Sequence, residues 1–221
     1  MASFSLEYLI RQPKIPQSNA PLLIMFHGYG SNEQDLFSFA DELPGELLII
    51  SARAPLSLGF GSYAWYTIHF DATSSDKFSD IPEAKEALKR IDQFINEVVA
   101  AYDVDEKNIF LLGFSQGTIL STAYALNHPH KIQHIAALSG YVNQELIEKP
   151  IEKESYKDLD FFVSHGSADQ VIPVEWARKT GPFLEKLNIK YSYREYPVGH
   201  GVAPQNFYDL HNWIKERCSS H

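Results

Sequence analysis

Short apolar runs alternate along this chain with stretches in which apolar residues recur every three or four positions. Unbroken or alternating apolar runs are typical of strands, whereas recurrence near 3.6 residues is typical of amphipathic helices. The apolar runs predict strands at residues 4–9, 22–26, 47–51, 109–112, 135–138, 161–164 and 191–196. The helical spacing predicts a helix that begins at Pro82 and others at residues 34–42, 116–127, 174–187 and 204–217. This alternation predicts an α/β protein with a mostly parallel central sheet flanked by helices on both faces.

Two intervals, residues 54–80 and 141–157, interrupt the alternation. The first mixes turn residues with large apolar side chains, and long connections of this kind are often functional. Both intervals follow strands at the edge where open α/β sheets bind ligands. We therefore predict a lid-like insertion at 54–80 over a substrate pocket that Leu58, Phe60 and Tyr66 help to line. Packing of these side chains on the core is the alternative.

Composition narrows the classes of function. The 221 residues suit one domain, expected to span 1–221, and a formal net charge of -9 disfavours nucleic acid or anionic lipid as a partner. No apolar window has the length of a membrane span, and the first residues lack signal-peptide features. We therefore expect a cytoplasmic protein without stable membrane insertion. The single cysteine, Cys218, excludes an internal disulfide and is expected to be a frayed surface group. The sequence is compatible with a homodimer but does not predict the oligomeric state.

The most informative motif is Gly113-Phe114-Ser115-Gln116-Gly117, which follows an apolar run and precedes a predicted helix. A serine whose hydroxyl projects above a sheet must sit on a tight strand-to-helix turn, called a nucleophile elbow. Residues two before and two after that serine cannot carry bulky side chains, and here both are glycine. The motif predicts Ser115 as a catalytic nucleophile.

A serine hydroxyl needs a base and an orienting acid to become a good nucleophile. With an elbow of this type the acid follows the serine along the chain and histidine comes last. His200 lies in a glycine-flanked loop between a predicted strand and the last predicted helix, and it is the predicted base. Asp169 directly follows a predicted strand and is the predicted acid, although an aspartate that only forms a turn is an alternative. The rival carboxylates are placed less well; they are Asp158, Asp160 and Glu175.

Backbone N–H donors must stabilise the negative charge that develops on an acyl oxygen. Gln116 begins the helix after the elbow, and its N–H is one predicted donor. The other is the N–H of Tyr29 in His27-Gly28-Tyr29-Gly30, where we expect His27 to fix the loop by hydrogen bonds. An ordinary strand-to-helix turn is the alternative for this glycine loop.

No metal or cofactor is predicted. Three histidines lie close together, at His128, His130 and His134, but Pro129 breaks the helix there and no acidic or cysteine ligand accompanies them. Neither a P-loop nor a dinucleotide-binding glycine motif occurs in the sequence.

With these motifs in place, the chain resembles the phospholipase/carboxylesterase family of α/β-hydrolases, which includes bacterial carboxylesterases and acyl-protein thioesterases. The resemblance rests on four ordered segments, at 27–30, 113–117, 165–173 and 196–200. It implies the α/β-hydrolase fold and the catalytic residues Ser115, Asp169 and His200. It also implies that Trp65 lines the acyl site. Thioesterase-like members usually have a leucine and then an acidic residue where this chain has Tyr29 and Ser31, so the resemblance implies the chemistry rather than the substrate.

The sequence therefore predicts a serine hydrolase that cleaves carboxylic esters with small to medium acyl chains through an acyl-enzyme. A small-molecule ester or thioester is the expected partner, because an aromatic wall suits an acyl chain. A lysophospholipase or an acyl-protein thioesterase with a preference for longer chains is the alternative among enzymes. From another class, a ligand-binding relative without turnover is a further alternative, because fold alone does not establish function.

Overall fold

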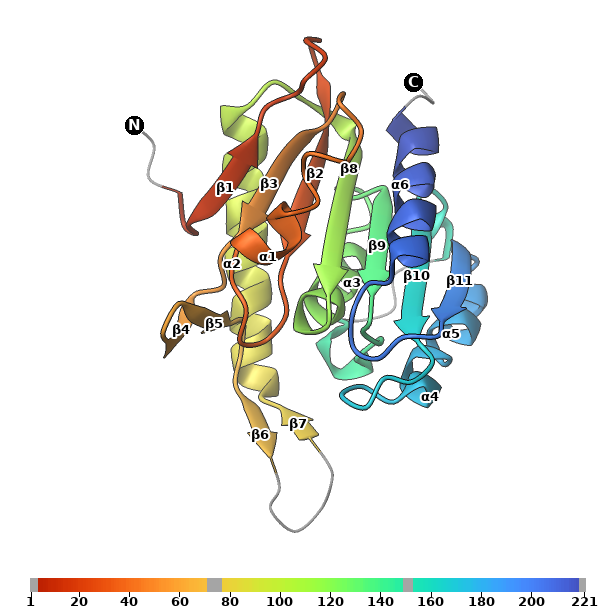
Figure 1. The fold of residues 1–221 in the computed structure, drawn as a ribbon. Coiled ribbons are helices and arrows are strands. Elements are labelled where there is room, and N and C mark those ends of the chain that lie inside the picture. Colours follow the sequence, from red (N-terminus) through yellow and green to blue (C-terminus); the bar gives the residue numbers. More distant parts are fainter. Residues whose placement is uncertain (1–3, 71–76, 149–152, 219–221) are drawn as a thin grey trace.

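The computed structural model describes residues 4–70, 77–148 and 153–218, and a seven-stranded sheet runs through them (Figure 1). The strand order is β1-β3-β2-β8-β9-β10-β11, in which β1 pairs antiparallel with β3 and all the other pairings are parallel. The strands are β1 (Tyr8–Arg11), β2 (Ala20–Phe26), β3 (Leu48–Ala52), β8 (Val104–Phe114), β9 (His134–Leu138), β10 (Asp160–Gly166) and β11 (Lys190–Tyr196). The predicted fold class is confirmed.

Helices cover both faces of the sheet, so the protein has two apolar cores (Figure 1). Alternate residues of β2 point into different cores, as the two-residue period of a strand requires: Leu22 and Ile24 into one, Leu23 and Met25 into the other. The first core includes α2 (Ile81–Ala101), α3 (Gln116–Asn127) and α5 (Thr180–Lys186). The second includes α1 (Gln34–Phe37) and α6 (Pro204–Cys218).

Several predicted elements have different bounds in the structure. The first strand begins at Tyr8 rather than residue 4, because the backbone N–H and the hydroxyl of Ser5 both donate to Glu97 of α2. The predicted helix 34–42 is shorter in the structure, where α1 ends at Phe37. Beyond it, backbone hydrogen bonds join residues three apart in the sequence, as between Phe39 N–H and Leu36 O at 3.0 Å. The predicted helix 174–187 is divided into α4 (Val174–Ala177) and α5, where Pro182 lacks the N–H that a continuous helix would use.

The described part of the interval 54–80 contains two antiparallel strand pairs that the sequence did not predict. One pairs β4 (Leu56–Gly59) with β5 (Ser62–Ala64), and the other pairs β6 (Ile68–Phe70) with β7 (Lys77–Ser79). Residues 71–76 of the predicted lid-like insertion lie outside the described residues.

Cys218 is half-buried against the second core rather than frayed, because α6 extends to it. Burial raises the pKa of its thiol to about 12. In the described ranges, no α-helix is both long enough and apolar enough to cross a bilayer.

Candidate active site

Ser115 lies between the end of β8 and the start of α3. Its backbone has φ 54° and ψ -115°, a conformation that residues other than glycine rarely adopt. Close backbone contacts hold it there. A Cβ on Gly117 would lie 1.9 Å from the carbonyl oxygen of Phe26, and a Cβ on Gly113 would lie 2.5 Å from the backbone of Gly117. The Ser115 N–H also donates to Leu138 O at 2.9 Å. The predicted sharp turn is therefore present.

The structure brings together the three side chains that the sequence predicted as a triad. The Ser115 Oγ lies 3.0 Å from His200 Nε2, and His200 Nδ1 lies 2.7 Å from Asp169 Oδ2. Because the carboxylate accepts the proton on Nδ1, Nε2 is left as the acceptor for the serine hydroxyl. The loops that carry Asp169 and His200 approach closely, since a Cβ on Gly166 would lie 2.1 Å from Gly199 O.

Asp169 is held by neutral donors. Its Oδ1 accepts from the N–H groups of Val171 at 2.8 Å and Ile172 at 2.9 Å, and its side chain is fully buried. His165 Nε2 lies 3.2 Å from the second carboxylate oxygen and 2.9 Å from Ile172 O, so its N–H is shared between the two acceptors. His165 was not among the predicted site residues, because its contact with Asp169 forms only when the loop after β10 closes.

The loop 27–30 lies directly against the elbow. A Cβ on Gly28 would lie 3.3 Å from Ser115 Cβ, while Gly30 N–H donates to Tyr63 O at 2.9 Å. His27 is buried, and its Nε2 accepts from Ala54 N–H at 3.0 Å, so its Nδ1–H donates to Gly28 O at 2.7 Å. Burial lowers the pKa of His27. A neutral imidazole thus fixes this loop by hydrogen bonds, as predicted.

The Gln116 side chain ties the elbow to the first hairpin. Its Oε1 accepts from Trp65 N–H at 2.8 Å, and its Nε2 donates to Tyr66 O at 2.8 Å. The Trp65 indole donates to His27 O at 2.9 Å and is 1% exposed. As the first residue of α3, Gln116 has a backbone N–H without an intrahelical partner.

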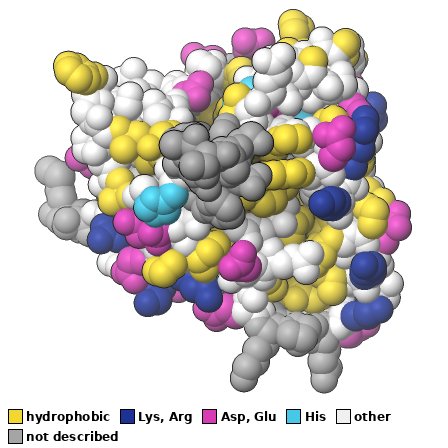
Figure 2. Space-filling view, turned by 90° about the horizontal axis from the view of Figure 1, so that it is seen from below, with side chains coloured by type: hydrophobic (Ala, Val, Ile, Leu, Met, Phe, Trp, Pro, Cys, Tyr) yellow, Lys and Arg dark blue, Asp and Glu magenta, His cyan; other side chains and the backbone are white. Residues whose placement is uncertain are grey.

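A cavity of about 180 Å³ opens beside Ser115. Its lining is Tyr29, Tyr66, Ile68, Ser79, Ser115, Gln116, Ile119, Tyr141, Val171, Ile172, Trp176 and His200. Figure 2 looks at this carboxyl end of the sheet and shows hydrophobic side chains gathered on it, with charged side chains set around its margin.

Of the predicted pocket residues, Tyr66 lines this cavity and the other three do not. Trp65 lies behind the cavity wall, where its ring packs edge-on against Phe26. Leu58 and Phe60 are exposed on the β4–β5 hairpin, and Phe60 stands at its tip between two glycines with positive φ. The turn geometry therefore directs Phe60 outward, which corrects the expected position of both residues.

Within the described ranges, histidine, cysteine and acidic side chains do not gather in a group of three that could hold a metal ion.

Comparison with known proteins agrees with this architecture. The sequence profile of the phospholipase/carboxylesterase family matches residues 9–218. A probable carboxylesterase from Oryza sativa subsp. japonica is 29% identical over 213 residues, which cover 91% of this chain and 79% of that protein. Acyl-protein thioesterase 1 from Kluyveromyces lactis is 27% identical over 210 residues, covering 88% of this chain and 91% of that protein.

Solved structures share the fold. The Bacillus cereus carboxylesterase superposes with a TM-score of 0.81 at 19% identity, covering 96% of this chain and 94% of that one. Esterase PE8 superposes with a TM-score of 0.80 at 22% identity, covering 96% and 99%. Since the family profile extends over nearly all of the described sheet and helices, the chain has the α/β-hydrolase fold and belongs to the phospholipase/carboxylesterase family.

Proposed function

We propose that the protein is a serine esterase that hydrolyses carboxylic esters through an acyl-enzyme, with Ser115 as nucleophile, His200 as base and Asp169 as the orienting acid. The observation that carries this proposal is the unbroken hydrogen-bonded series from Ser115 Oγ through His200 to Asp169, at 3.0 and 2.7 Å. Both distances lie within the range needed for proton transfer between such groups.

The reaction proceeds in two halves. As Ser115 Oγ attacks the ester carbonyl carbon, its proton passes to His200 Nε2, and Asp169 stabilises the imidazolium that forms. His200 then returns the proton to the departing alcohol, which leaves an acyl group on Ser115. Water attacks this acyl-enzyme with His200 again as base, and the carboxylic acid is released.

The N–H groups of Tyr29 and Gln116 are proposed to stabilise the oxyanion. Support comes from the position of Gln116 at the start of α3 and from the packing of Gly28 against the Ser115 side chain. Losing one such donor typically lowers the rate by about 100- to 1000-fold. The hydrogen bonds of His27, Trp65 and the Gln116 side chain hold both donor segments in place.

The cavity beside Ser115 favours substrates with a small to medium apolar acyl group, because tyrosine, isoleucine and tryptophan side chains form much of its wall. The second candidate is a thioesterase with longer chains, which is favoured by the similarity to acyl-protein thioesterase 1. Specificity constants across acyl lengths, measured for oxygen esters and thioesters, separate the two candidates.

Pre-steady-state hydrolysis of p-nitrophenyl butyrate tests the proposal. We expect a burst of nitrophenol close to one equivalent of enzyme, followed by slower turnover, because acylation precedes hydrolysis of the acyl-enzyme. Ser115→Ala should abolish both phases. Ser139→Ala is a matched control, since Ser139 is also buried and also has a positive φ, at 51°. Full hydrolysis by Ser115→Ala would refute the assignment.

A further inference from the structure

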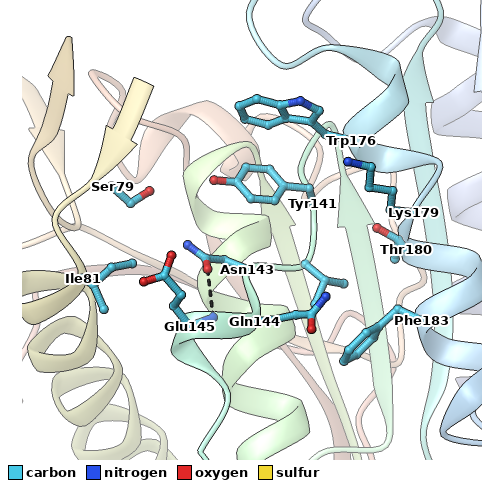
Figure 3. A pocket seen from close by; sticks show the side chains of 11 residues that line it. Ser79, Ile81, Tyr141, Asn143, Gln144, Glu145, Trp176, Lys179, Thr180 and Phe183 are labelled. Atoms are coloured by element: carbon cyan, nitrogen blue, oxygen red, sulfur yellow. Dashed lines mark hydrogen bonds between the residues drawn. The ribbon is translucent and has the colours of Figure 1, made fainter. Parts of the chain in front are cut away.

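A second, larger cavity adjoins the one beside Ser115 (Figure 3). Its volume is about 520 Å³, against about 180 Å³ for the cavity that contains Ser115. The two cavities share three lining residues, which are Ser79, Tyr141 and Trp176. The rings of Tyr141 and Trp176 meet edge to face with centroids 5.2 Å apart, and because both residues line each cavity, they mark the boundary along which the two cavities adjoin. One elongated ligand can therefore extend from Ser115 into the larger cavity.

The larger cavity is the more polar of the two. The residues that line it beyond the three shared ones include Asn143, Gln144, Glu145, Lys179 and Thr180. In Figure 3, Lys179 and Thr180 lie on the wall that carries Trp176, whereas Glu145 lies on the opposite wall near Ile81. A ligand in this cavity thus meets a cation on one side and a carboxylate on the other.

Two groups on the Trp176 wall lack a partner within the described residues. Thr180 is 3% exposed, yet its Oγ1 makes no hydrogen bond there, and Figure 3 shows this oxygen directed toward the cavity. Lys179 is an exposed residue that lines the cavity, and its ammonium group forms no ion pair among the described side chains. Buried hydroxyls are normally satisfied, so an unpartnered one beside a cation is a feature that a hydrogen-bond acceptor would complete.

We propose that this larger cavity, lined on one wall by Lys179 and Thr180, is a distal subsite for the carboxylate end of an elongated ester. The subsite rests on the proposed esterase function, because it assigns a substrate class to the same reaction. The apolar part of such a substrate lies against the faces that Tyr141 and Trp176 turn to the two cavities, while its carbonyl carbon lies at Ser115. Its carboxylate accepts from the Lys179 ammonium and the Thr180 hydroxyl. Glu145 on the opposite wall repels the carboxylate, so the carboxylate binds at the wall that carries Lys179 and Thr180.

Matched pairs of esters test the subsite. In one series, ethyl esters of straight fatty acids are compared with monoethyl esters of dicarboxylic acids of the same length. In the other, acetate esters of straight alcohols are compared with those of ω-hydroxy acids, which places the carboxylate in the leaving group. We expect the carboxylate to raise kcat/KM by about tenfold at the best length of one series, the size of effect that one charge-assisted hydrogen bond produces. Most of the change should lie in KM, because the group is remote from the reacting atoms.

Lys179→Gln with Thr180→Val should remove this preference and leave the hydrolysis of uncharged esters unchanged. Lys186→Gln is the matched control, since it removes the same charge from an exposed lysine at the last residue of α5, away from the cavity, whereas Lys179 caps the start of that helix. The control should keep the preference.

The outcomes separate the two proposals. If uncharged esters are hydrolysed but the carboxylate gives no advantage in either series at any length, the subsite is wrong and the esterase function stands. If no ester is hydrolysed, the esterase function fails. Calorimetric binding of the same pairs to Ser115→Ala tests the subsite without turnover: tighter binding of the carboxylate-ended member, lost with Lys179→Gln and Thr180→Val, supports it, and equal binding overturns it.

Discussion

Two buried aspartates at opposite ends of the same strand have different surroundings. Asp160 begins β10, where its Oδ2 lies 2.6 Å from Arg217 and 3.0 Å from Lys190. Asp169 follows the other end of β10 and is held by two backbone N–H groups and by His200. Their exposed fractions are almost equal, at 7% and 8%. The partners, rather than the depth of burial, therefore distinguish a structural carboxylate from one suited to orient an imidazole.

The two ends of the sheet differ in the same way as the two aspartates. At the amino end of the strands, the charge of Asp160 is balanced by cations of α6 and β11. At the carboxyl end, two backbone N–H groups hold the Asp169 carboxylate, and no lysine or arginine pairs with it among the described residues, so its charge remains available to stabilise a developing imidazolium. We therefore expect substitutions at the carboxyl end to affect catalysis and substitutions at the amino end to affect the stability of the fold.

The largest expected difference is catalytic. Asp169→Asn should lower kcat for ester hydrolysis by about 10⁴, because an amide in place of the carboxylate favours the wrong tautomer of His200. Asp160→Asn should leave kcat within about twofold, since its surroundings lie at the far end of the strand. Steady-state kinetics on one small ester compare the two variants. Similar losses in both would remove the distinction between the two aspartates.

The next effect concerns backbone packing at the elbow. Gly117→Ala should lower the free energy of unfolding by about 3 kcal/mol or more, because the added methyl group would overlap the carbonyl of Phe26. Gly201→Ala is the control, since a Cβ there meets nothing within 4 Å. Urea denaturation followed by tryptophan fluorescence measures both. An unchanged midpoint for Gly117→Ala would show that the elbow relaxes more easily than its geometry implies.

Asp160→Asn is expected to act on stability instead. Removal of the Asp160 carboxylate leaves the Arg217 guanidinium, 13% exposed, with only the largely exposed Glu216 as an acidic partner. We expect a loss of about 2 kcal/mol in the free energy of unfolding, below the 3–5 kcal/mol typical of fully buried pairs because Lys190 is largely exposed. The same denaturation experiment checks this value. Retained stability would mean that the ion pairs at this end contribute little.

The smallest effect is a pH dependence at the carboxyl end. Burial keeps the pKa of His27 below its ordinary value of 6.5, so the unfolded chain takes up a proton below that pH that the folded chain does not. Stability should therefore fall as the pH drops from 7 toward 5, by at most about 1.4 kcal/mol per pH unit from this residue. His27→Gln should be less stable at pH 8 but show a shallower slope. Equal slopes would exclude His27 as a source of the acid sensitivity.

Much of the sheet and the three-residue cluster could be predicted from the sequence because local patterns encode them. The glycines two residues before and after Ser115 indicate a turn that has no room for larger side chains. The chain order of acid and histidine in such folds then pointed to Asp169 and His200. The strands at residues 22–26 and 109–112 lie within β2 and β8, since their apolar runs match their burial.

Other features depend on contacts that no local pattern contains. The outward position of Phe60 follows from the positive φ values of its flanking glycines, whereas its hydrophobicity alone indicated a pocket. Trp65 is fixed by hydrogen bonds to two segments distant in the sequence. The role of His165 as a neighbour of Asp169 emerges only when the loop closes.

The most direct test of the central claim is to treat the protein with a fluorophosphonate and locate the adduct by peptide mass spectrometry. Ser115 hydrogen-bonded to His200 should be modified stoichiometrically, and Asp169→Asn should slow the labelling strongly without moving it. An adduct on another residue, or no labelling of folded protein, would contradict the account.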